Sequence, residues 1–225
     1  MTTWGFIGSG NIGSTVAQLA VNAGHSVVMS NSRGPETLAD VVATLGPRSR
    51  AATVDEAASS GEVVVVTIPL KHYREIPTAA LSDRIVVDTM NYYPGRDGEF
   101  VQLDDGSTTS SELLQALIPD SRVVKAFNNI FYQHLAVLPR PAGSPDRSAL
   151  PVAGDDVAAN ASVAGLLDEL GYDVVDLGVL AEGWRTQPGM PAYGTPYAVD
   201  PSNWPAGARP SGVAEIAELA AAARR

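Results

Sequence analysis

Residues 2–33 read TTWGFIGSGNIGSTVAQLAVNAGHSVVMSNSR, and this stretch decides the fold. A short apolar run at 4–7 leads into three glycines, Gly8, Gly10 and Gly13, which open a segment with apolar residues at helical spacing. A second apolar run follows at 26–29. The pattern predicts a strand, a tight turn, a helix and a second strand, which together make a βαβ unit.

The three glycines have the spacing GxGxxG, and each has its own role in a turn that binds a dinucleotide. Gly8 permits the turn, Gly10 lets the backbone approach a pyrophosphate, and Gly13 lets the helix pack closely on the strand. The phosphates would lie at the helix N-terminus, where unpaired N–H groups and the helix dipole favour negative charge. Because strand, helix and second strand stand in the required order, we favour dinucleotide binding over a merely structural glycine turn.

The end of the second predicted strand favours NADP over NAD. An NAD site usually has an acidic side chain here, but the strand is followed by Ser30, Asn31, Ser32 and Arg33, with no carboxylate before Glu36. Arg33 can pair with a 2′-phosphate, and the hydroxyl and amide groups can donate hydrogen bonds to it. The alternative is an ordinary polar loop before a helix. We therefore expect NADP(H) as the cofactor.

Composition excludes several other classes of function. The chain has 225 residues, of which 45% are hydrophobic, and no apolar run approaches the ~20 residues of a membrane span. It starts directly with a predicted strand and not with a signal peptide, so we expect a cytoplasmic protein without a membrane partner. It has no cysteine and three scattered histidines, which argues against thiol chemistry and metal sites. A net charge of −10 argues against nucleic-acid binding.

Further apolar runs predict a doubly wound, mostly parallel α/β sheet of the Rossmann type. The clearest buried strand is EVVVVTI at 62–68, and others are predicted at 84–89 and 122–127, with a helix at 71–81 that contains Pro77. Loops at the carboxyl ends of parallel strands line the ligand crevice. The candidate crevice residues are Thr67, Ile68, Pro69, Asn91 and Asn128. A plain strand-ending proline and an Asx turn remain the alternatives for Pro69 and Asn91.

The composition changes at 139–146, PRPAGSPD, which we interpret as a linker. It separates an NADP-binding core at 1–138 from a C-terminal extension at 147–225. Two strands joined by an alanine-rich helix are predicted within 149–176, and we expect this βαβ-type extension to pack on the same domain and lengthen its sheet.

Residues 178–210 have no periodicity. They contain six prolines and four large aromatic residues, Trp184, Tyr193, Tyr197 and Trp204. Long loops are usually functional or disordered, and the aromatic content argues against disorder. We interpret the segment as a proline-stiffened loop that covers a planar substrate or a partner subunit. A terminal helix is predicted at 211–223.

Four segments together resemble the F420-dependent NADP oxidoreductase family: GSGNIG at 8–13, SNSR at 30–33, TIP at 67–69 and PVAGDD at 151–156. The resemblance implies a parallel-sheet protein, commonly dimeric, that passes hydride between NADPH and the deazaflavin coenzyme F420. It also implies that the NADP phosphates are held by Ser9, Asn11, Ile12, Ser32 and Arg33, and that the nicotinamide is backed by Thr67, Ile68 and Pro69. The proline-rich sequence at 183–189 departs from the helical sequence that the family has there.

We therefore expect an NADP(H)-dependent oxidoreductase, with F420 as the favoured small-molecule acceptor and a homodimer as the favoured assembly. Hydride transfer between two rings needs positioning and no strong acid or base, and Thr67, Pro69, Asn91 and Asn128 would supply that positioning. One alternative is a reductase of a flavin, ferric ion, ketone or imine, and another is a non-catalytic NADP sensor. A ketone or imine reductase would need a proton donor from Lys125, Tyr132 or His134. We expect Lys125 to reach solvent and His134 to lie on a helix surface.

Overall fold

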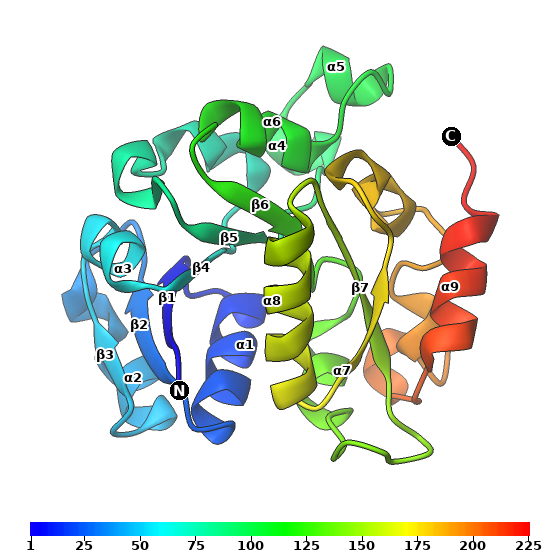
Figure 1. Cartoon of the computed structure of the whole chain (residues 1–225), viewed down its shortest axis with the longest axis horizontal. Coiled ribbons are helices and arrows are strands. Elements are labelled where there is room, and N and C mark those ends of the chain that lie inside the picture. The colour runs from blue at the N-terminus through cyan, green and yellow to red at the C-terminus, as the bar shows by residue number, and fades with distance from the viewer.

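A single eight-stranded sheet, in the order β3-β2-β1-β4-β5-β6-β7-β8, runs through the computed structural model, which describes residues 1–225 (Figure 1). The strands are β1 Thr3–Ile7, β2 Ser26–Ser30, β3 Ser49–Ala51, β4 Val63–Val66, β5 Ile85–Asp88, β6 Arg122–Lys125, β7 Ala149–Gly154 and β8 Asp173–Asp176. The first six are parallel, β7 is antiparallel to β6, and β8 is parallel to β7. The predicted doubly wound, mostly parallel sheet with its C-terminal βαβ-type extension is confirmed.

Nine α-helices accompany the sheet. They are α1 Asn11–Asn22, α2 Ala39–Leu45, α3 Val54–Ser60, α4 Pro94–Asp97, α5 Val101–Asp104, α6 Ser110–Leu117, α7 Tyr132–Val137, α8 Val157–Glu169 and α9 Val213–Ala222. Six 3₁₀ helices lie between them: η1 Pro35–Leu38, η2 Leu70–Glu75, η3 Thr78–Leu81, η4 Leu180–Thr186, η5 Thr195–Tyr197 and η6 Trp204–Ala206. Helix α8 lies against β6 and β7, and α9 lies against β7 and β8 (Figure 1). None of the helices has both the length and the apolar character to cross a membrane.

Strand β4 shows why the chain folds as a layered sheet. Its four valines are all buried, with Val63 and Val65 in one apolar core and Val64 and Val66 in the other. Successive side chains of a strand point to opposite faces, so a strand that is covered on both sides must be apolar at every position. The first core includes side chains of α1, α7, α8 and α9, and the second includes side chains of η2 and α6.

The prediction of one continuous helix at 71–81 is wrong. The structure has two short 3₁₀ helices there, η2 and η3, and the chain between them is extended at Ile76. Pro77 explains the break, because proline donates no backbone hydrogen bond and pushes the preceding residue out of the helical region. The second of these helices therefore starts just after the proline.

The C-terminal part continues the same sheet. Helix α8 connects β7 to β8, and the side chain of Asp156 caps it by accepting a hydrogen bond from Ala159 N at 2.8 Å. Residues 178–210 fold over this part as three short 3₁₀ helices and connecting loops. Tyr197 anchors them, since its ring is completely buried and its hydroxyl donates to Ala149 O at 2.8 Å. The division at 139–146 stays a prediction, although the strands on both sides of it belong to one sheet.

Candidate cofactor and acceptor site

The glycine turn between β1 and α1 is built by close backbone packing. Gly8 has a φ of +111°, and a Cβ atom placed there would lie 2.4 Å from the carbonyl oxygen of Thr67. A Cβ atom on Gly13 would lie 2.6 Å from Cγ2 of the same Thr67 and 2.8 Å from Gly8 O. These two positions require glycine because strand, helix and the end of β4 meet here.

Gly10 is different, because a Cβ atom built on it meets no protein atom within 4 Å. Gly10 is the N-cap residue of α1, and no side chain caps this helix end. Packing within the protein therefore gives no reason for a glycine here. An open helix N-terminus with unpaired N–H groups suits a phosphate group, and a glycine lets that group approach the backbone.

A first cavity of about 390 Å³ lies between the ends of β1, β2 and β4. Its wall includes Gly8, Ser9, Gly10, Asn31, Ser32, Thr67, Ile68 and Pro69 from the predicted site. The Asn31 side chain donates to Ser9 Oγ at 3.3 Å and to Thr37 Oγ1 at 2.9 Å. His72 and Glu75 of η2 also line it, and sequence reasoning missed both because it expected an α-helix there.

The residues after β2 take different positions. Ser30 is completely buried and its hydroxyl donates to Phe6 O at 2.6 Å, so its side chain joins β2 to β1 and does not line the cavity. Asn31 and Ser32 do line it. Arg33 is exposed, and its guanidinium makes no hydrogen bond or ion pair with the rest of the chain. Arg33 does not line the cavity, and its guanidinium is free to pair with a phosphate.

A second cavity, of about 320 Å³, begins where the first one ends. The two share Gly10, Thr67, Ile68 and Pro69, so they form one groove past the N-terminus of α1. Asn11, Ile12, Asn91 and Asn128 of the predicted site line only the second part. Its other walls include six large aromatic residues, Tyr93, Phe127, Phe131, Tyr132, Tyr193 and Trp204. All four residues predicted to position a hydride therefore face one cavity.

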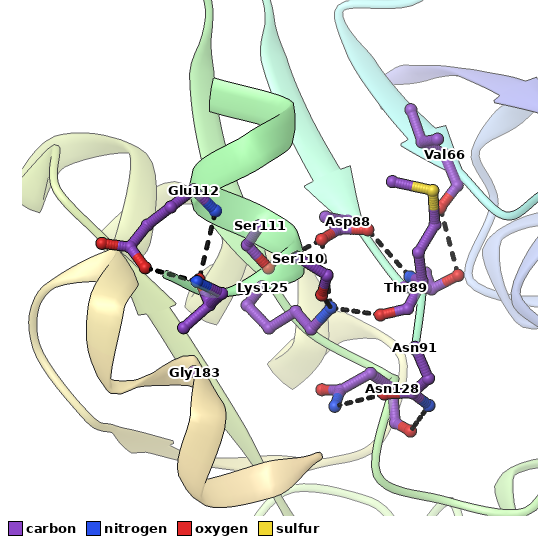
Figure 2. Close-up of polar contacts among 12 residues, drawn as sticks. Val66, Asp88, Thr89, Asn91, Ser110, Ser111, Glu112, Lys125, Asn128 and Gly183 are labelled. Carbon is purple, nitrogen blue, oxygen red and sulfur yellow. Dashed lines mark hydrogen bonds and ion pairs between the residues drawn. The ribbon is translucent and has the colours of Figure 1, made fainter. Parts of the chain in front are cut away.

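Asn91 and Asn128 join the ends of β5 and β6 with their amide groups (Figure 2). The Asn91 side chain donates to Asn128 O at 2.7 Å, and the Asn128 side chain donates to Asn91 Oδ1 at 3.2 Å. Asn128 also donates to Thr186 O at 2.9 Å, which fixes η4 to the end of β6. Phe127, just before it, has a φ of +60°, a conformation that is uncommon for a residue with a side chain and is frequent at functional sites.

Lys125 does not reach solvent, and our expectation for it was wrong. It is 4% exposed and forms an ion pair of 3.0 Å with Asp88, its partner in the β5–β6 register (Figure 2). The lysine also donates to Met90 O, and Asp88 accepts from Met90 N at 2.8 Å and from Ser111 Oγ at 2.7 Å. The burial follows from the position of β6 between β5 and β7, with Gly183 packed on the lysine stem. The pair thus holds both backbone polar groups of Met90, the residue before Asn91.

His134 is also not where we expected it. It is 2% exposed, and its Nε2 lies 2.8 Å from Trp204 O, because the 178–210 segment covers this side of α7. Its ring packs edge-on against Phe131, with centroids 5.3 Å apart. Of the three proton donors considered from the sequence, only Tyr132 lines the second cavity.

Two tyrosines that the sequence did not single out as a pair meet in this cavity. The hydroxyls of Tyr93 and Tyr193 are 2.5 Å apart, and burial, followed by the hydrogen bond to Tyr93, raises the pKa of Tyr193 above its ordinary value. The guanidinium of Arg96 lies 4.7 Å from the centre of the Tyr93 ring. Only the position of Tyr93 after β5 could have indicated its role.

Trp184 is outside the cavity, where Arg185 and Arg225 lie over its ring.

Comparison with known proteins identifies a family for the first part of the chain. Residues 3–92 match the family model described as NADP oxidoreductase, coenzyme F420-dependent. The metalloreductase STEAP3 of Rattus norvegicus is 32% identical over 179 residues, which are 79% of this chain and 34% of that protein. The chain thus spans about a third of the length of this curated relative.

Two solved structures are similar over most of the chain. A hypothetical protein from Sinorhizobium meliloti has a TM-score of 0.74 and 33% identity, with 86% of this chain and 93% of the other covered. A candidate F420-dependent NADP reductase from Arthrobacter sp. FB24 has a TM-score of 0.67 and 28% identity, with 80% and 85% covered. Residues 3–92 are therefore an NADP-binding domain of the F420-dependent NADP oxidoreductase family.

Proposed function

We propose that this protein transfers hydride between NADPH and a planar organic acceptor, and that coenzyme F420 is the favoured acceptor. The observation that carries the proposal is the continuous groove formed by two cavities that share Gly10, Thr67, Ile68 and Pro69. An extended dinucleotide that crosses the N-terminus of α1 would place its adenosine in the first cavity. Its nicotinamide would then lie in the second, next to the aromatic walls.

Different predicted residues would bind different parts of NADPH. Asn31, Ser32 and Arg33 would hold the 2′-phosphate at the end of β2, while the open space at Gly10 would take the pyrophosphate. Pro69, together with Thr67 and Ile68, would back the nicotinamide. The cofactor supplies the hydride, and the protein supplies position and exclusion of water.

The shape and chemistry of the second cavity support a flat acceptor. Phe131, Tyr132 and Trp204 offer ring faces and edges to a planar molecule. The Asn91 amide uses one of its two N–H donors within the chain and offers the other to the polar edge of that molecule. Hydride transfer needs the donor and acceptor carbons about 3 to 3.5 Å apart, which two rings held face to face can achieve. The family description and the similarity to the Arthrobacter protein favour F420 among such acceptors.

The similarity to a metalloreductase supports a second candidate. It extends over 179 residues and so beyond the glycine motif, which makes a flavin or a ferric ion the next acceptors to test. A ketone or imine acceptor and a non-catalytic NADP sensor remain further alternatives. The homodimer also remains a proposal, and sedimentation of the purified protein tests it.

Two measurements on the purified protein test the proposal. Calorimetry with NADPH and with NADH should give tighter binding of NADPH. Oxidation of NADPH, followed at its absorbance band, should then be fastest with F420 when compared with flavin, ferric, quinone, ketone and imine acceptors. Tight binding of NADPH with only background rates for every acceptor would favour the sensor, and no binding of NADPH would overturn the proposal.

A further inference from the structure

Tyr93 and Tyr193 approach each other from opposite sides of the second cavity. Tyr93 follows β5 and precedes α4, and its backbone N–H donates to Asp97 Oδ2 at 3.0 Å. Tyr193 belongs to the 178–210 segment, and Asn129 fixes both of its neighbours. The Asn129 side chain donates to Ala192 O at 2.9 Å, and Gly194 N donates to Asn129 O at 2.8 Å. Both rings are therefore held by rigid parts of the chain, and their meeting is a built feature of the cavity.

The two hydroxyls carry two protons, and the hydrogen bond between them uses only one of these protons. They lie 2.5 Å apart, and neither has another hydrogen-bond partner in the chain. Whichever hydroxyl donates to the other, the accepting hydroxyl keeps its own proton for a third group. Both tyrosines line the cavity, so a molecule that binds there can be that third group. The raised pKa of Tyr193, caused first by burial, keeps this phenol protonated at neutral pH.

Charged side chains lie next to the pair. The Arg96 guanidinium lies over the Tyr93 ring at 4.7 Å, and its charge lowers the pKa of Tyr193, although burial outweighs this effect. Asp97 offsets part of this effect, since its carboxylate is 2.8 Å from Arg96. Tyr93 also lines an outer cavity of about 570 Å³ together with Asp104, Asp105, Arg224 and Arg225. Tyr93 thus stands between the second cavity and this outer one, from which a lost proton can be replaced.

We propose that the Tyr93–Tyr193 hydroxyl pair donates the proton that accompanies hydride transfer, and that the acceptor is an organic molecule with a conjugated C=N or C=O group. Hydride leaves the dihydronicotinamide with its electron pair and forms a C–H bond on the acceptor. The π electrons of the acceptor move to its nitrogen or oxygen, and the O–H bond of one tyrosine breaks as the proton moves there. Solvent returns a proton to the tyrosine through the other hydroxyl. The sum is NADPH, a proton and the acceptor giving NADP⁺ and the reduced acceptor.

This inference rests on the proposed function and narrows its substrate class. An acceptor that takes hydride at carbon becomes an anion unless its nitrogen or oxygen is protonated, so a proton donor in the cavity speeds that reaction. A ferric ion takes single electrons and needs no proton at the site. The tyrosine pair therefore favours a deazaflavin-like, flavin-like, carbonyl or imine acceptor over a metal ion.

Phenylalanine substitutions test the pair, since they remove a hydroxyl and keep the ring. Y93F and Y193F are compared with Y132F, which removes the other phenol of the cavity, and with Y92F. Tyr92 is the matched control because its hydroxyl lies outside the acceptor cavity, where its single proton can be donated to Asp104 Oδ1 at 2.9 Å or to Gly98 O at 3.1 Å. Each variant is assayed with the organic acceptor that the wild-type protein reduces fastest and with ferric citrate. The readouts are NADPH binding, kcat, its pH profile and its isotope effect in D₂O.

We expect at least one of Y93F and Y193F to lower kcat with the organic acceptor about 100-fold, the low end for a general acid, with NADPH binding within twofold of wild type. The solvent isotope effect of the wild type should change in that variant, and Y92F should behave as wild type. Unchanged kcat in both Y93F and Y193F overturns the inference, as does loss of activity in Y132F alone. Faster reduction of ferric citrate than of every organic acceptor overturns the substrate class. If the wild type itself neither binds nor oxidises NADPH, this result contradicts the proposed function, and the inference is contradicted with it.

Discussion

The two halves of the groove are assembled in different ways. The first cavity depends on Gly8, Gly10, Asn31 and Ser32, which belong to one βαβ unit, and on the end of β4. The second depends on side chains that are distant in sequence, such as the Tyr93–Tyr193 pair, whose members are 100 residues apart. Backbone geometry thus fixes the first cavity, which we call the cofactor half because it would hold the adenosine and phosphates. Long-range side-chain contacts fix the second cavity, which we call the acceptor half. Substitutions should therefore affect binding of the cofactor and turnover of the acceptor separately.

The largest effect is expected for Gly8→Ala in the cofactor half. The new Cβ atom would lie 2.4 Å from Thr67 O, and the φ of +111° is strained for alanine. We expect the free energy of unfolding to fall by about 3 kcal/mol or more, which urea unfolding measures, together with loss of NADPH binding.

Gly10→Ala is the matched variant, because its Cβ atom meets no protein atom within 4 Å. We expect its stability to stay within about 1 kcal/mol of wild type, whereas NADPH binding should weaken at least tenfold, about 1.4 kcal/mol. Wild-type affinity in this variant would show that the pyrophosphate does not lie beside Gly10.

A more selective effect is expected for Arg33→Ala. The guanidinium has no partner in the chain, so its removal should leave the stability unchanged. Binding of NADPH should weaken by about 1.5 to 3 kcal/mol, the range for a lost hydrogen bond to a charged group, while binding of NADH should change little. Calorimetry with both nucleotides measures the difference. Equal losses for the two cofactors would contradict the assignment of the 2′-phosphate to Arg33.

Most of the residues that line the first cavity could be predicted from the sequence because their determinants are local, and their role in cofactor binding stays a prediction. The glycine spacing, the missing acid after β2 and the all-valine β4 are each visible within a few residues. Thr67, Ile68 and Pro69 followed from the general rule that ligands lie at the carboxyl ends of parallel strands. Ser30 shows the limit of this reasoning, because strand position alone does not tell which face a hydroxyl takes or that it bonds to Phe6.

The acceptor half could not be predicted in the same way, since burial there depends on which distant segment covers each residue. Lys125 is the last residue of β6, a position from which a lysine side chain can reach solvent. In this protein η4 covers it and Asp88 forms an ion pair with it. His134 belongs to a short helix that the 178–210 segment covers with Trp204. Aspartate and lysine at the last positions of two adjacent buried strands were the one sequence signal for the ion pair. Nothing local indicated that Tyr193 would meet Tyr93.

Asn129→Ala probes the acceptor half alone. Asn129 is buried, and its amide donates to Ala192 O and to Tyr197 Oη, so its loss should destabilise the protein by about 1 to 2 kcal/mol. The wall that carries Tyr193 would then loosen, which should lower kcat with the acceptor and leave the NADPH dissociation constant unchanged. The control is Asn203→Ala in the same segment, where the side chain is exposed and makes no hydrogen bond. A parallel loss of NADPH affinity in the Asn129 variant would mean that the two halves of the groove are coupled and not separately built.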